Sequence, residues 1–456
     1  MRIFDKIVTK KNKYYSQDIL FYFRLQQMNL KEKQISHDLT KSGVTLKRYV
    51  IGRRDTDTDL GTLNVGRYLA LDKSMGSHVQ MDALRPHAIL ICGKRGYGKS
   101  YTMGTLIEEL SALPSNINIA TLVVDTMGIF WTMRHPNTKE EDILSKWDLS
   151  PKGFDIQLFV PMGSLKQYEQ MHIEVKPFSI SVAELSGYDW CSLFDLAPIS
   201  PIGVYVLKTI EEIKEKSHDF SLLDLIDHIN SDVEADITLC NAAKNYFRTA
   251  ISWGIFHENG IDICDIIQKG KVVILDLSSI ANQNIKAIAV KILGSRIYDE
   301  RIRSRRLYEQ RKMGENPIEQ GIPMVWMFID EAHLFLPAVG ETPATDVLVN
   351  EWLRQGRQPG LSVVFATQRP AALHPDVMSQ SDIIICHRLT AQDDISALEA
   401  VRPTYMREGI GDSLKKMGME KGVAFIVDDN SESAHVVRMR PRKSWHGGDE
   451  PSALEK

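Results

Sequence analysis

The chain of 456 residues lacks several features that would place it in a special class of protein. It has no apolar stretch of the ~18–20 uninterrupted residues that a membrane-spanning helix needs, and its N-terminus lacks the apolar core of a signal peptide. Its five cysteines include no C-x-x-C pair, which argues against a zinc site and against a disulfide framework. We therefore expect a cytoplasmic protein with reduced, mostly buried thiols and no membrane contact.

An excess of positive charge is also missing, because 55 Lys and Arg residues face 59 Asp and Glu residues. A protein coated in basic surface for nucleic acid would show the opposite balance. If DNA binds, it binds locally, as when a ring lines a narrow channel with a few Lys and Arg side chains per subunit. Hydrophobic residues make up 43% of the chain, as in ordinary globular proteins, so most of the chain should fold.

From Gly61 almost to the C-terminus, short apolar runs alternate with helical stretches. This alternation is typical of an α/β domain built on a mostly parallel sheet, whose strands are buried on both faces. The expected strands, each nearly continuous in apolar or β-branched residues, are His87–Cys92, Ile119–Asp125, Lys271–Leu277, Pro323–Ile329, Leu361–Ala366, Asp382–Cys386 and Gly422–Val427.

Changes in this pattern predict five segments along the chain. Residues 1–60 form an N-terminal appendage with one amphipathic helix at Ile19–Gln34, and 438–456 form an extended arm that is ordered only by contact with something else. Between them lie a core in two parts, 61–180 and 266–437, and a helical insertion, 181–265. A long helix is expected from Asn284 to Arg306, followed by a polar surface loop that leads to the strand at Pro323.

The strongest motif follows the first expected strand and matches the Walker A pattern G-x-x-x-x-G-K-S. Its residues, which with the next one are predicted to bind ATP, are Gly93, Lys94, Arg95, Gly96, Tyr97, Gly98, Lys99, Ser100 and Tyr101. The glycines let successive backbone amides face phosphates, Lys99 neutralises the β- and γ-phosphates, and Ser100 offers a hydroxyl to Mg²⁺. The alternative, a glycine-rich turn that binds nothing, is disfavoured by the strand before the motif and the helix after it.

A second motif is the apolar strand Met324–Ile329 followed by two carboxylates, which has the form of a Walker B motif. Asp330 would hold Mg²⁺, and Glu331 would orient or deprotonate the attacking water. His333 completes a D-E-A-H string, but the order of the elements differs from that of the two-lobed DEAH-box helicases. We expect His333 to be a local structural residue.

Three further polar residues follow this strand. Gln368 lies at the end of the next core strand, where P-loop motors read the γ-phosphate, and it is the expected sensor. Arg354 and Arg357 are predicted on one face at the end of a helix, from which they could reach a neighbouring subunit's ATP site. The alternative for the two arginines is a solvated helix end, where cations favour the dipole. Arg305, Arg306, Arg311 and Lys312 are read as a solvated loop rather than as DNA contacts.

The motifs together resemble the HerA family within the HerA/FtsK group of hexameric translocases. The matching stretches are LNVGRYLALD, LVVDTMG, DIIQKGKVVILDLS, WMFIDEAHLFLP, LRQGRQPG and FATQRP…SQSDIIICHRL, in this order. The resemblance implies a RecA-like P-loop NTPase core, a hexameric ring with ATP sites between subunits, and DNA in the central pore. It also implies a site role for Asp125, a trans role for the two arginines, and a C-terminal brace that reaches a neighbour, with Arg440, Arg442 and His446 as candidates there.

The family resemblance also implies a nuclease partner such as NurA, although the short N-terminal segment here differs from the long β-barrel with which the family docks it. The sequence therefore predicts an ATP-hydrolysing, ring-forming DNA translocase or helicase that works with a nuclease or other effector in DNA repair or antiviral defence. Two alternatives stay open. One is an ATP-regulated scaffold of a defence complex, and the other is a soluble coupling ATPase of the conjugation or secretion type, whose relatives usually carry transmembrane helices.

Overall fold

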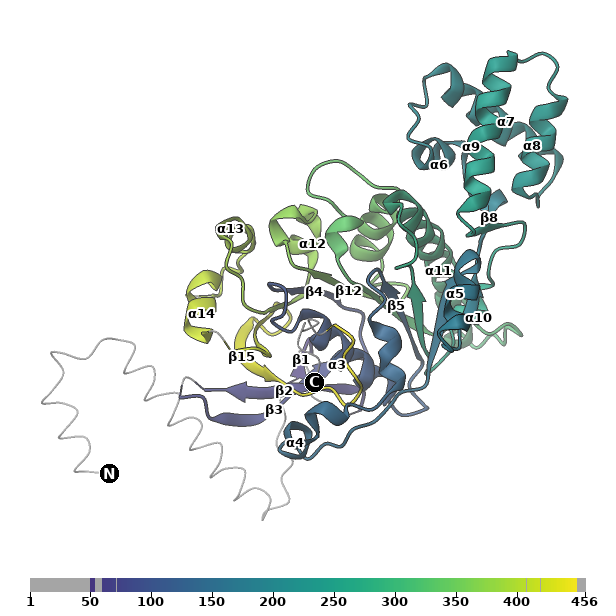
Figure 1. Cartoon of the computed structure of the whole chain (residues 1–456). Coiled ribbons are helices and arrows are strands. Elements are labelled where there is room, and N and C mark those ends of the chain that lie inside the picture. Colours follow the sequence, from purple (N-terminus) through teal and green to yellow (C-terminus); the bar gives the residue numbers. More distant parts are fainter. Residues whose placement is uncertain (1–49, 54–59, 71, 407, 419, 449–456) are drawn as a thin grey trace, which may run out of the picture. The chain divides into compact units, whose positions relative to one another are not determined.

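The structure is a computed structural model that describes residues 50–53, 60–70, 72–406, 408–418 and 420–448. The predicted helix Ile19–Gln34 lies outside these residues, and so does most of the predicted N-terminal appendage. Within the described residues, no helix is both long enough and apolar enough to cross a membrane. The described part is built around one large sheet with helices on both faces (Figure 1).

The large sheet has 13 strands in the order β1-β3-β2-β15-β14-β13-β4-β12-β11-β5-β10-β6-β7. All neighbours from β13 to β7 pair in parallel, whereas β14, β15, β2 and β3 form an antiparallel extension next to β13. The mostly parallel α/β core is therefore confirmed. The strand bounds are β1 Val50–Ile51, β2 Thr62–Leu69, β3 Met75–Asp82, β4 Ala88–Cys92, β5 Ile119–Asp125, β6 Ile156–Pro161, β7 Lys176–Phe178, β10 Val272–Asp276, β11 Met324–Ile329, β12 Leu361–Thr367, β13 Ile383–Cys386, β14 Val423–Asp428 and β15 Ser433–Met439.

Helices connect the parallel strands and fill the segment between β7 and β10. Their bounds are α3 Lys99–Ser111, α4 Glu141–Ser145, α5 Leu165–Gln170, α6 Gly187–Leu193, α7 Pro201–Lys216, α8 Leu222–Ser231, α9 Ile237–Ser252, α10 Ile263–Ile266, α11 Gln283–Lys312, α12 Pro375–Gln380, α13 Gln392–Ala400 and α14 Ile410–Met417. Ser186, Ser200, Ser221 and Asp236 start α6 to α9 by accepting a backbone N–H with their side chains. A small sheet joins β8 Ile180–Ser181 to β9 Phe256–His257, at the two ends of this helical region.

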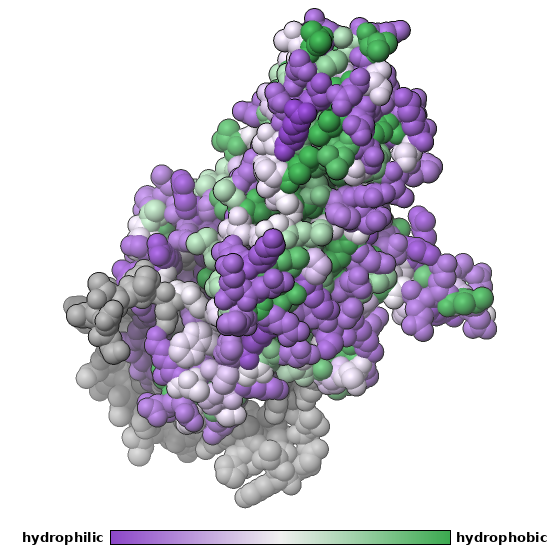
Figure 2. Space-filling view, turned by 45° about the vertical axis from the view of Figure 1, so that its right-hand side comes forward, coloured by the Kyte–Doolittle hydropathy of each residue, from purple (hydrophilic) through white to green (hydrophobic). Residues whose placement is uncertain are grey.

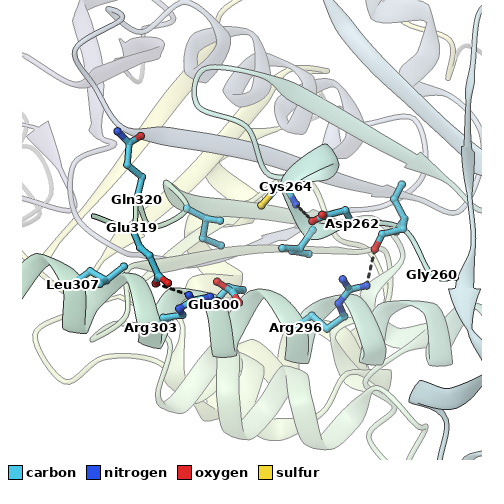
Figure 3. A pocket seen from close by; sticks show the side chains of 13 residues that line it. Gly260, Asp262, Cys264, Arg296, Glu300, Arg303, Leu307, Glu319 and Gln320 are labelled. Carbon is cyan, nitrogen blue, oxygen red and sulfur yellow. Dashed lines mark hydrogen bonds and ion pairs between the residues drawn. The ribbon is translucent and has the colours of Figure 1, made fainter. Parts of the chain in front are cut away.

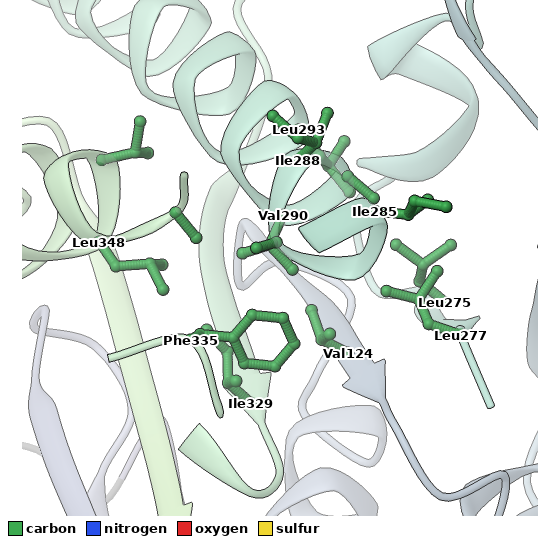
Figure 4. Close-up of a cluster of buried hydrophobic side chains, with 14 of the residues drawn as sticks. Val124, Leu275, Leu277, Ile285, Ile288, Val290, Leu293, Ile329, Phe335 and Leu348 are labelled. Carbon is green, nitrogen blue, oxygen red and sulfur yellow. The ribbon is translucent and has the colours of Figure 1, made fainter. Parts of the chain in front are cut away.

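The main hydrophobic core lies between the sheet and α11. Figure 4 shows Ile288, Val290 and Leu293 of α11 above residues of β5, β10 and β11, with Val124 and Ile329 among them. Residues that alternate with these along the strands are also buried, and α3 contributes Met103, Leu106 and Ile107, which lie outside this cluster. Since strand side chains alternate between faces, α3 covers the opposite face of the sheet. Burial on both faces explains why the parallel strands are continuous in apolar residues.

Several predicted boundaries were wrong. The predicted helix from Asn284 to Arg306 runs on to Lys312 as α11, so the residues read as the start of a polar loop are helical. Among them, Arg305 pairs with Glu309 along the helix, and the Arg311 guanidinium donates to a backbone carbonyl. The C-terminal segment expected to be an extended arm begins inside β15. These elements are set by tertiary contacts that the sequence pattern does not display.

A buried ion-pair cluster ties the antiparallel extension to the parallel core at the start of β4. His87 Nδ1 lies 2.7 Å from Asp382 Oδ2, and His87 Nε2 lies 3.5 Å from Asp82 Oδ2. The other oxygen of Asp82 accepts from the Arg53 guanidinium at 2.5 Å. Burial alone would lower the pKa of His87, but the hydrogen bond to Asp382 and the ion pair with Asp82 outweigh it and raise the pKa to about 9.

We expect this histidine to make stability depend on pH. Its folded pKa of about 9 lies above the unfolded value of about 6.5, so its stabilisation is complete below the unfolded pKa and is lost as the pH rises through 9. Melting temperatures of the unsubstituted chain should therefore fall between pH 7 and pH 10, and the slope should be smaller in His87→Gln. The exposed His257 serves as the control, because His257→Gln should keep the full slope. Equal slopes in all three proteins would mean that His87 is not charged in the fold.

Candidate active site

The phosphate-binding motif forms the turn between β4 and α3. Gly98 has φ 114° and stands directly before the first helical residue, Lys99, a backbone conformation that L side chains rarely adopt. Gly93 has no room for a side chain, since an added Cβ would lie 2.6 Å from Cβ of His387. The loop therefore requires glycine at both positions. It ends at the N-terminus of α3, where free backbone N–H groups favour an anion.

The two motifs far apart in the sequence meet at the carboxyl ends of β4 and β11. Lys99 Nζ donates to Asp330 Oδ1 at 2.6 Å and to Glu331 Oε1 at 3.3 Å. Ser100 Oγ donates to Asp330 Oδ2 at 3.1 Å. Burial alone would lower the pKa of Lys99, but attraction from Asp330 and Glu331 outweighs it and raises the pKa. The lysine is therefore a charged, buried group held between two carboxylates.

Glu331 is positioned by its backbone and by the neighbouring strand β12. Its φ of 50° and ψ of 47° are left-handed, which costs a residue with a side chain roughly 1–2 kcal/mol. Gln368 Nε2 donates to Glu331 Oε1 at 2.5 Å, whereas Oε2 is buried and has no hydrogen-bond partner among the described residues. His333 Nδ1 lies 3.5 Å from Oε2 and 3.1 Å from Thr367 Oγ1. The strained carboxylate thus has one oxygen fixed and one free to accept a proton.

Two further carboxylates lie at the ends of the next strands, β5 and β10. Asp125 accepts backbone N–H groups of Met127, Gly128 and Phe130, so it shapes the turn that follows β5. Asp276 accepts the Tyr168 hydroxyl at 2.7 Å. Burial, and then the charge of Asp276, raise the pKa of Asp125 to about 7. Asp125 thus has a clear structural role at the sheet edge that carries the motifs.

Other predicted site residues are exposed or bond to residues outside the cluster. Lys94 and Arg95 are exposed on the loop, and the Tyr101 hydroxyl donates to Glu140 Oε2 at 2.7 Å rather than facing the loop. Arg354 ends the π-helix η6, Val347–Arg354, whereas Arg357 lies in the turn after it. The prediction that both arginines share one helix face was wrong, because the helix ends before Arg357.

The two arginines also differ in their contacts. Arg354 forms an ion pair with Asp376 of α12 and donates to Asn350 Oδ1 at 2.8 Å. Arg357 is exposed and has no ion pair with any described residue of the chain. Neither arginine bonds to Lys99, Asp330, Glu331 or Gln368. Of the two, Arg357 is the side chain that is free to meet another molecule.

The segment after β15, expected to be ordered only by another molecule, packs along α3 of its own chain. Arg440 Nη1 donates to Glu108 Oε2 at 2.8 Å, and the Ser444 backbone and hydroxyl donate to Glu108 Oε1 at 2.8 and 2.6 Å. Arg442 is also buried, and His446 lies edge-on to Tyr101. Arg440 and Arg442 are therefore held within their own chain. The sequence offered no signal for Glu108, which sits on the helix as an ordinary glutamate.

We expect Glu108→Ala to be strongly destabilising, by about 3–5 kcal/mol, because it leaves the buried Arg440 guanidinium without its main partner. The change should appear as a lower urea midpoint with an unchanged slope. Glu109→Ala is the matched control. Glu109 is the next residue and its carboxylate also contacts Arg440, but it is partly exposed. The loss of stability in Glu109→Ala should therefore be much smaller. Similar losses in both variants would contradict the assigned role of Glu108.

A hollow among the described residues lies away from these side chains. It has a volume of about 600 Å³ and is lined by α11, the start of α10 and residues 319–322, which lead into the amino end of β11 (Figure 3). Its arginines are already paired, since Arg303 donates to Glu319 at 2.5 Å and Arg296 donates to the Ile261 carbonyl at 2.8 Å. The hollow lies near the amino end of β11, whereas the motifs lie at the carboxyl ends of the strands. It therefore contributes no residue to the candidate site.

The fold and the side chains at the carboxyl edge of its sheet define a P-loop ATPase. The P-loop strand β4 lies between β13 and β12, and the carboxylate strand β11 lies beyond β12. The solved structure of VirB4 of Thermoanaerobacter pseudethanolicus has a similar fold, with a TM-score of 0.51, 11% identity, and coverage of 84% of this chain and 97% of that one.

The family model described as the central domain of helicase HerA matches residues 63–296, slightly more than half of the chain. The chain belongs to the HerA family. It is 22% identical over 426 residues to the DNA double-strand break repair helicase HerA of Sulfolobus acidocaldarius, covering 88% of this chain and 75% of that protein. The protein of the same name from Sulfurisphaera tokodaii is 22% identical over 405 residues, covering 87% and 72%.

Proposed function

We propose that this protein is an ATP-driven DNA translocase or helicase that acts as a ring. The observation that carries the proposal is the buried cluster of Lys99, Asp330, Glu331 and Gln368 at the carboxyl ends of three adjacent strands. These side chains supply what phosphoryl transfer to water needs, namely a cation for the phosphates, a carboxylate for the water and a polar group that senses the γ-phosphate. The names of the relatives place those proteins in DNA double-strand break repair, and we extend that role to this chain.

Ser100 and Asp330 are the residues that would hold Mg²⁺. Their oxygens lie 3.1 Å apart, and a hydroxyl with a single carboxylate fits a metal that keeps several waters and binds chiefly through substrate phosphates. Lys99, Asp330 and Glu331 together have a formal charge of −1, so a triphosphate anion needs a divalent cation beside it. When bound, the metal neutralises charge on the β- and γ-phosphate oxygens.

The chain's own residues account for the remaining chemistry. A bound triphosphate competes for the ammonium group of Lys99, which frees both carboxylates from it. Gln368 still holds one oxygen of Glu331, so the unpaired Oε2 accepts a proton from the attacking water or orients it. The left-handed backbone at Glu331 turns this carboxylate back toward Lys99 rather than along the strand direction.

Charge is distributed unevenly along the chain in a way that disfavours DNA at the insertion. Residues 181–265 contain fifteen Asp and Glu against five Lys and Arg, whereas the other residues contain 44 and 50. The insertion therefore has a net charge of −10, residues 1–60 have one of +6, and residues 61–180 and 266–456 together are balanced. Figure 2 shows hydrophilic and hydrophobic side chains intermixed over α6–α9. Because phosphates are repelled by such an acidic surface, DNA should meet the core rather than the insertion.

The ring is part of the proposal because the described cluster has no arginine for the transition state. Arg357, exposed and without an ion pair to any described residue, would supply it to the neighbouring subunit, as the family resemblance implies for a hexamer. In the same proposal, residues 61–180 and 266–437 form the RecA-like motor. A separate nuclease or other effector protein would act on the DNA that the motor delivers.

The test is ATP turnover by the purified full chain with and without linear double-stranded DNA, with Glu331→Gln as the control. Turnover that DNA stimulates several-fold and that Glu331→Gln abolishes supports the translocase. Turnover that is indifferent to DNA would overturn DNA translocation and favour an ATP-regulated scaffold. Two assays then distinguish a helicase from a translocase. A helicase separates the two strands of a duplex, whereas a translocase moves along a duplex that stays intact.

A further inference from the structure

The side of the phosphate loop that faces β13 carries residues with no role in the cluster just described. β13 pairs in parallel with β4, and the chain continues past Cys386 so that His387 N–H donates to the Cys92 carbonyl at 2.8 Å. One residue on, the Arg388 carbonyl accepts from Lys94 N–H of the loop, also at 2.8 Å. The backbone after β13 is thus hydrogen-bonded to the loop itself.

His387 is an uncharged side chain that stabilises the contact between the phosphate loop and the backbone after β13. Its Nδ1 lies 3.0 Å from the Val423 carbonyl, which can only accept, so the proton is on Nδ1, and Nε2 accepts from the Thr102 hydroxyl at 2.9 Å. Burial lowers the pKa of His387 to about 4, so the ring is uncharged near neutral pH. His387 therefore fixes the start of α3 against β14 without adding charge, whereas the next residue, Arg388, carries a charge.

The Arg388 side chain lies over the loop and has an unused donor. Its guanidinium carbon is 5.4 Å from the centre of the Tyr97 ring, a cation–π contact with a residue of the loop. Its Nη1 is buried and has no hydrogen-bond partner in the part of the chain that the structure describes. A buried guanidinium nitrogen without a partner is costly, and such a group in a native fold calls for an acceptor. No carboxylate among the described residues pairs with Arg388, in contrast to Lys99.

We propose that Arg388 donates from Nη1 to a phosphate oxygen of the nucleotide bound by the P-loop of its own subunit. Glu331 and Gln368 act from the β11 and β12 side of β4, whereas Arg388 acts from the β13 side. The phosphate chain is thus held from both sides of the loop, and Tyr97 keeps the guanidinium in place over it. This inference rests on the proposed nucleotide site, but it assigns a residue that neither motif contains.

The experiment is equilibrium binding of ADP and of inorganic pyrophosphate to the full chain, measured without turnover by calorimetry. Arg388→Met keeps an unbranched apolar stem against Tyr97 but removes the donors. It should weaken both ligands by about ten- to a hundredfold, the usual effect of losing a hydrogen bond to a charged group. Arg388→Lys should recover part of the loss. Arg369→Met, at an exposed arginine beside Gln368, is the matched control and should bind as the unsubstituted chain does.

The outcomes separate this inference from the proposed function. If the unsubstituted chain binds both ligands and Arg388→Met binds them equally well, the Arg388 assignment is wrong and the nucleotide site stands. If Tyr97→Leu weakens binding while Arg388→Met does not, the contact serves only to pack the loop, which also overturns the assignment. If the unsubstituted chain binds neither ligand, both proposals fail. Melting curves of each variant show whether a loss reflects unfolding.

Discussion

Replacing Glu331 by Gln should reduce ATP turnover by at least about a hundredfold, while nucleotide binding changes by no more than a few-fold. The substitution keeps the size and the oxygen that Gln368 and Lys99 hold, and it replaces the unpaired Oε2 by an N–H₂ group that cannot accept a proton from water. The measurement pairs steady-state phosphate release with calorimetric binding of ATP. Removing one negative charge beside the phosphates should, if anything, tighten binding.

Two other variants show whether Glu331 acts on the water or on the nucleotide. Lys99→Ala should abolish binding as well as turnover, because it removes the cation that faces the phosphates. Gln368→Ala should bind normally but turn over slowly, since Glu331 then loses the group that fixes it. If Glu331→Gln kept more than a tenth of the turnover, another carboxylate would have to be the base, and Asp125 would be the first to test.

Six strands of the parallel core, β4, β5, β10, β11, β12 and β13, could be predicted because they are buried on both faces, whereas β6 and β7 were not predicted. Continuous apolar runs such as those of β5 and β10 follow directly from that burial. Of the antiparallel extension, β14 was predicted as Gly422–Val427, but β2, β3 and β15 could not be predicted in the same way. β3 is half exposed and contains Gly76, Ser77 and His78, and its place in the sheet depends on pairing with β2 rather than on its own pattern.

Some residues of the candidate site could likewise be predicted from the strand pattern, and others could not. Lys99, Asp330 and Gln368 could be predicted because each follows a recognisable strand, and carboxyl ends of parallel strands meet at one edge. Their mutual distances depend on the sheet order, which the sequence does not display. Tyr101 was assigned to the nucleotide by its position alone, whereas its hydroxyl bonds to Glu140 and accepts from the Arg442 backbone. His387 and Arg388 were missed because their contacts to the loop exist only after β13 has paired with β4.

The π-helix before Arg357 shows how local geometry changes a functional prediction. In an α-helix, residues 354 and 357 would share a face. The i to i+5 winding of Val347–Arg354 and the turn after it separate them instead. Arg354 is then drawn to Asp376, and Arg357 is left facing solvent. Of two arginines that the sequence treats as equivalent, the structure therefore favours the second for a role toward another subunit.

Arg357→Ala should lower turnover about a thousandfold without weakening nucleotide binding, the effect expected when an arginine finger is lost. Arg354→Ala is the matched control. Its guanidinium is held by Asp376 and Asn350 of its own chain, so the loss should be small. If Arg354→Ala were the inactive variant, the ion pair with Asp376 would have to open in the assembly, and the assignment of Arg357 would be wrong.

Mixing two inactive variants then tests whether Arg357 acts in the neighbouring subunit. An Arg357→Ala subunit keeps an intact phosphate loop, and a Lys99→Ala subunit keeps an intact arginine. When equal amounts of the two variants assemble into rings at random, roughly a quarter of the interfaces join the intact loop of an Arg357→Ala subunit to the intact arginine of a Lys99→Ala subunit. Turnover should reappear in proportion to these interfaces. No recovery after complete subunit exchange would place Arg357 in its own subunit's site or outside the reaction. Recovery would show that the active site is completed by a second copy of the chain.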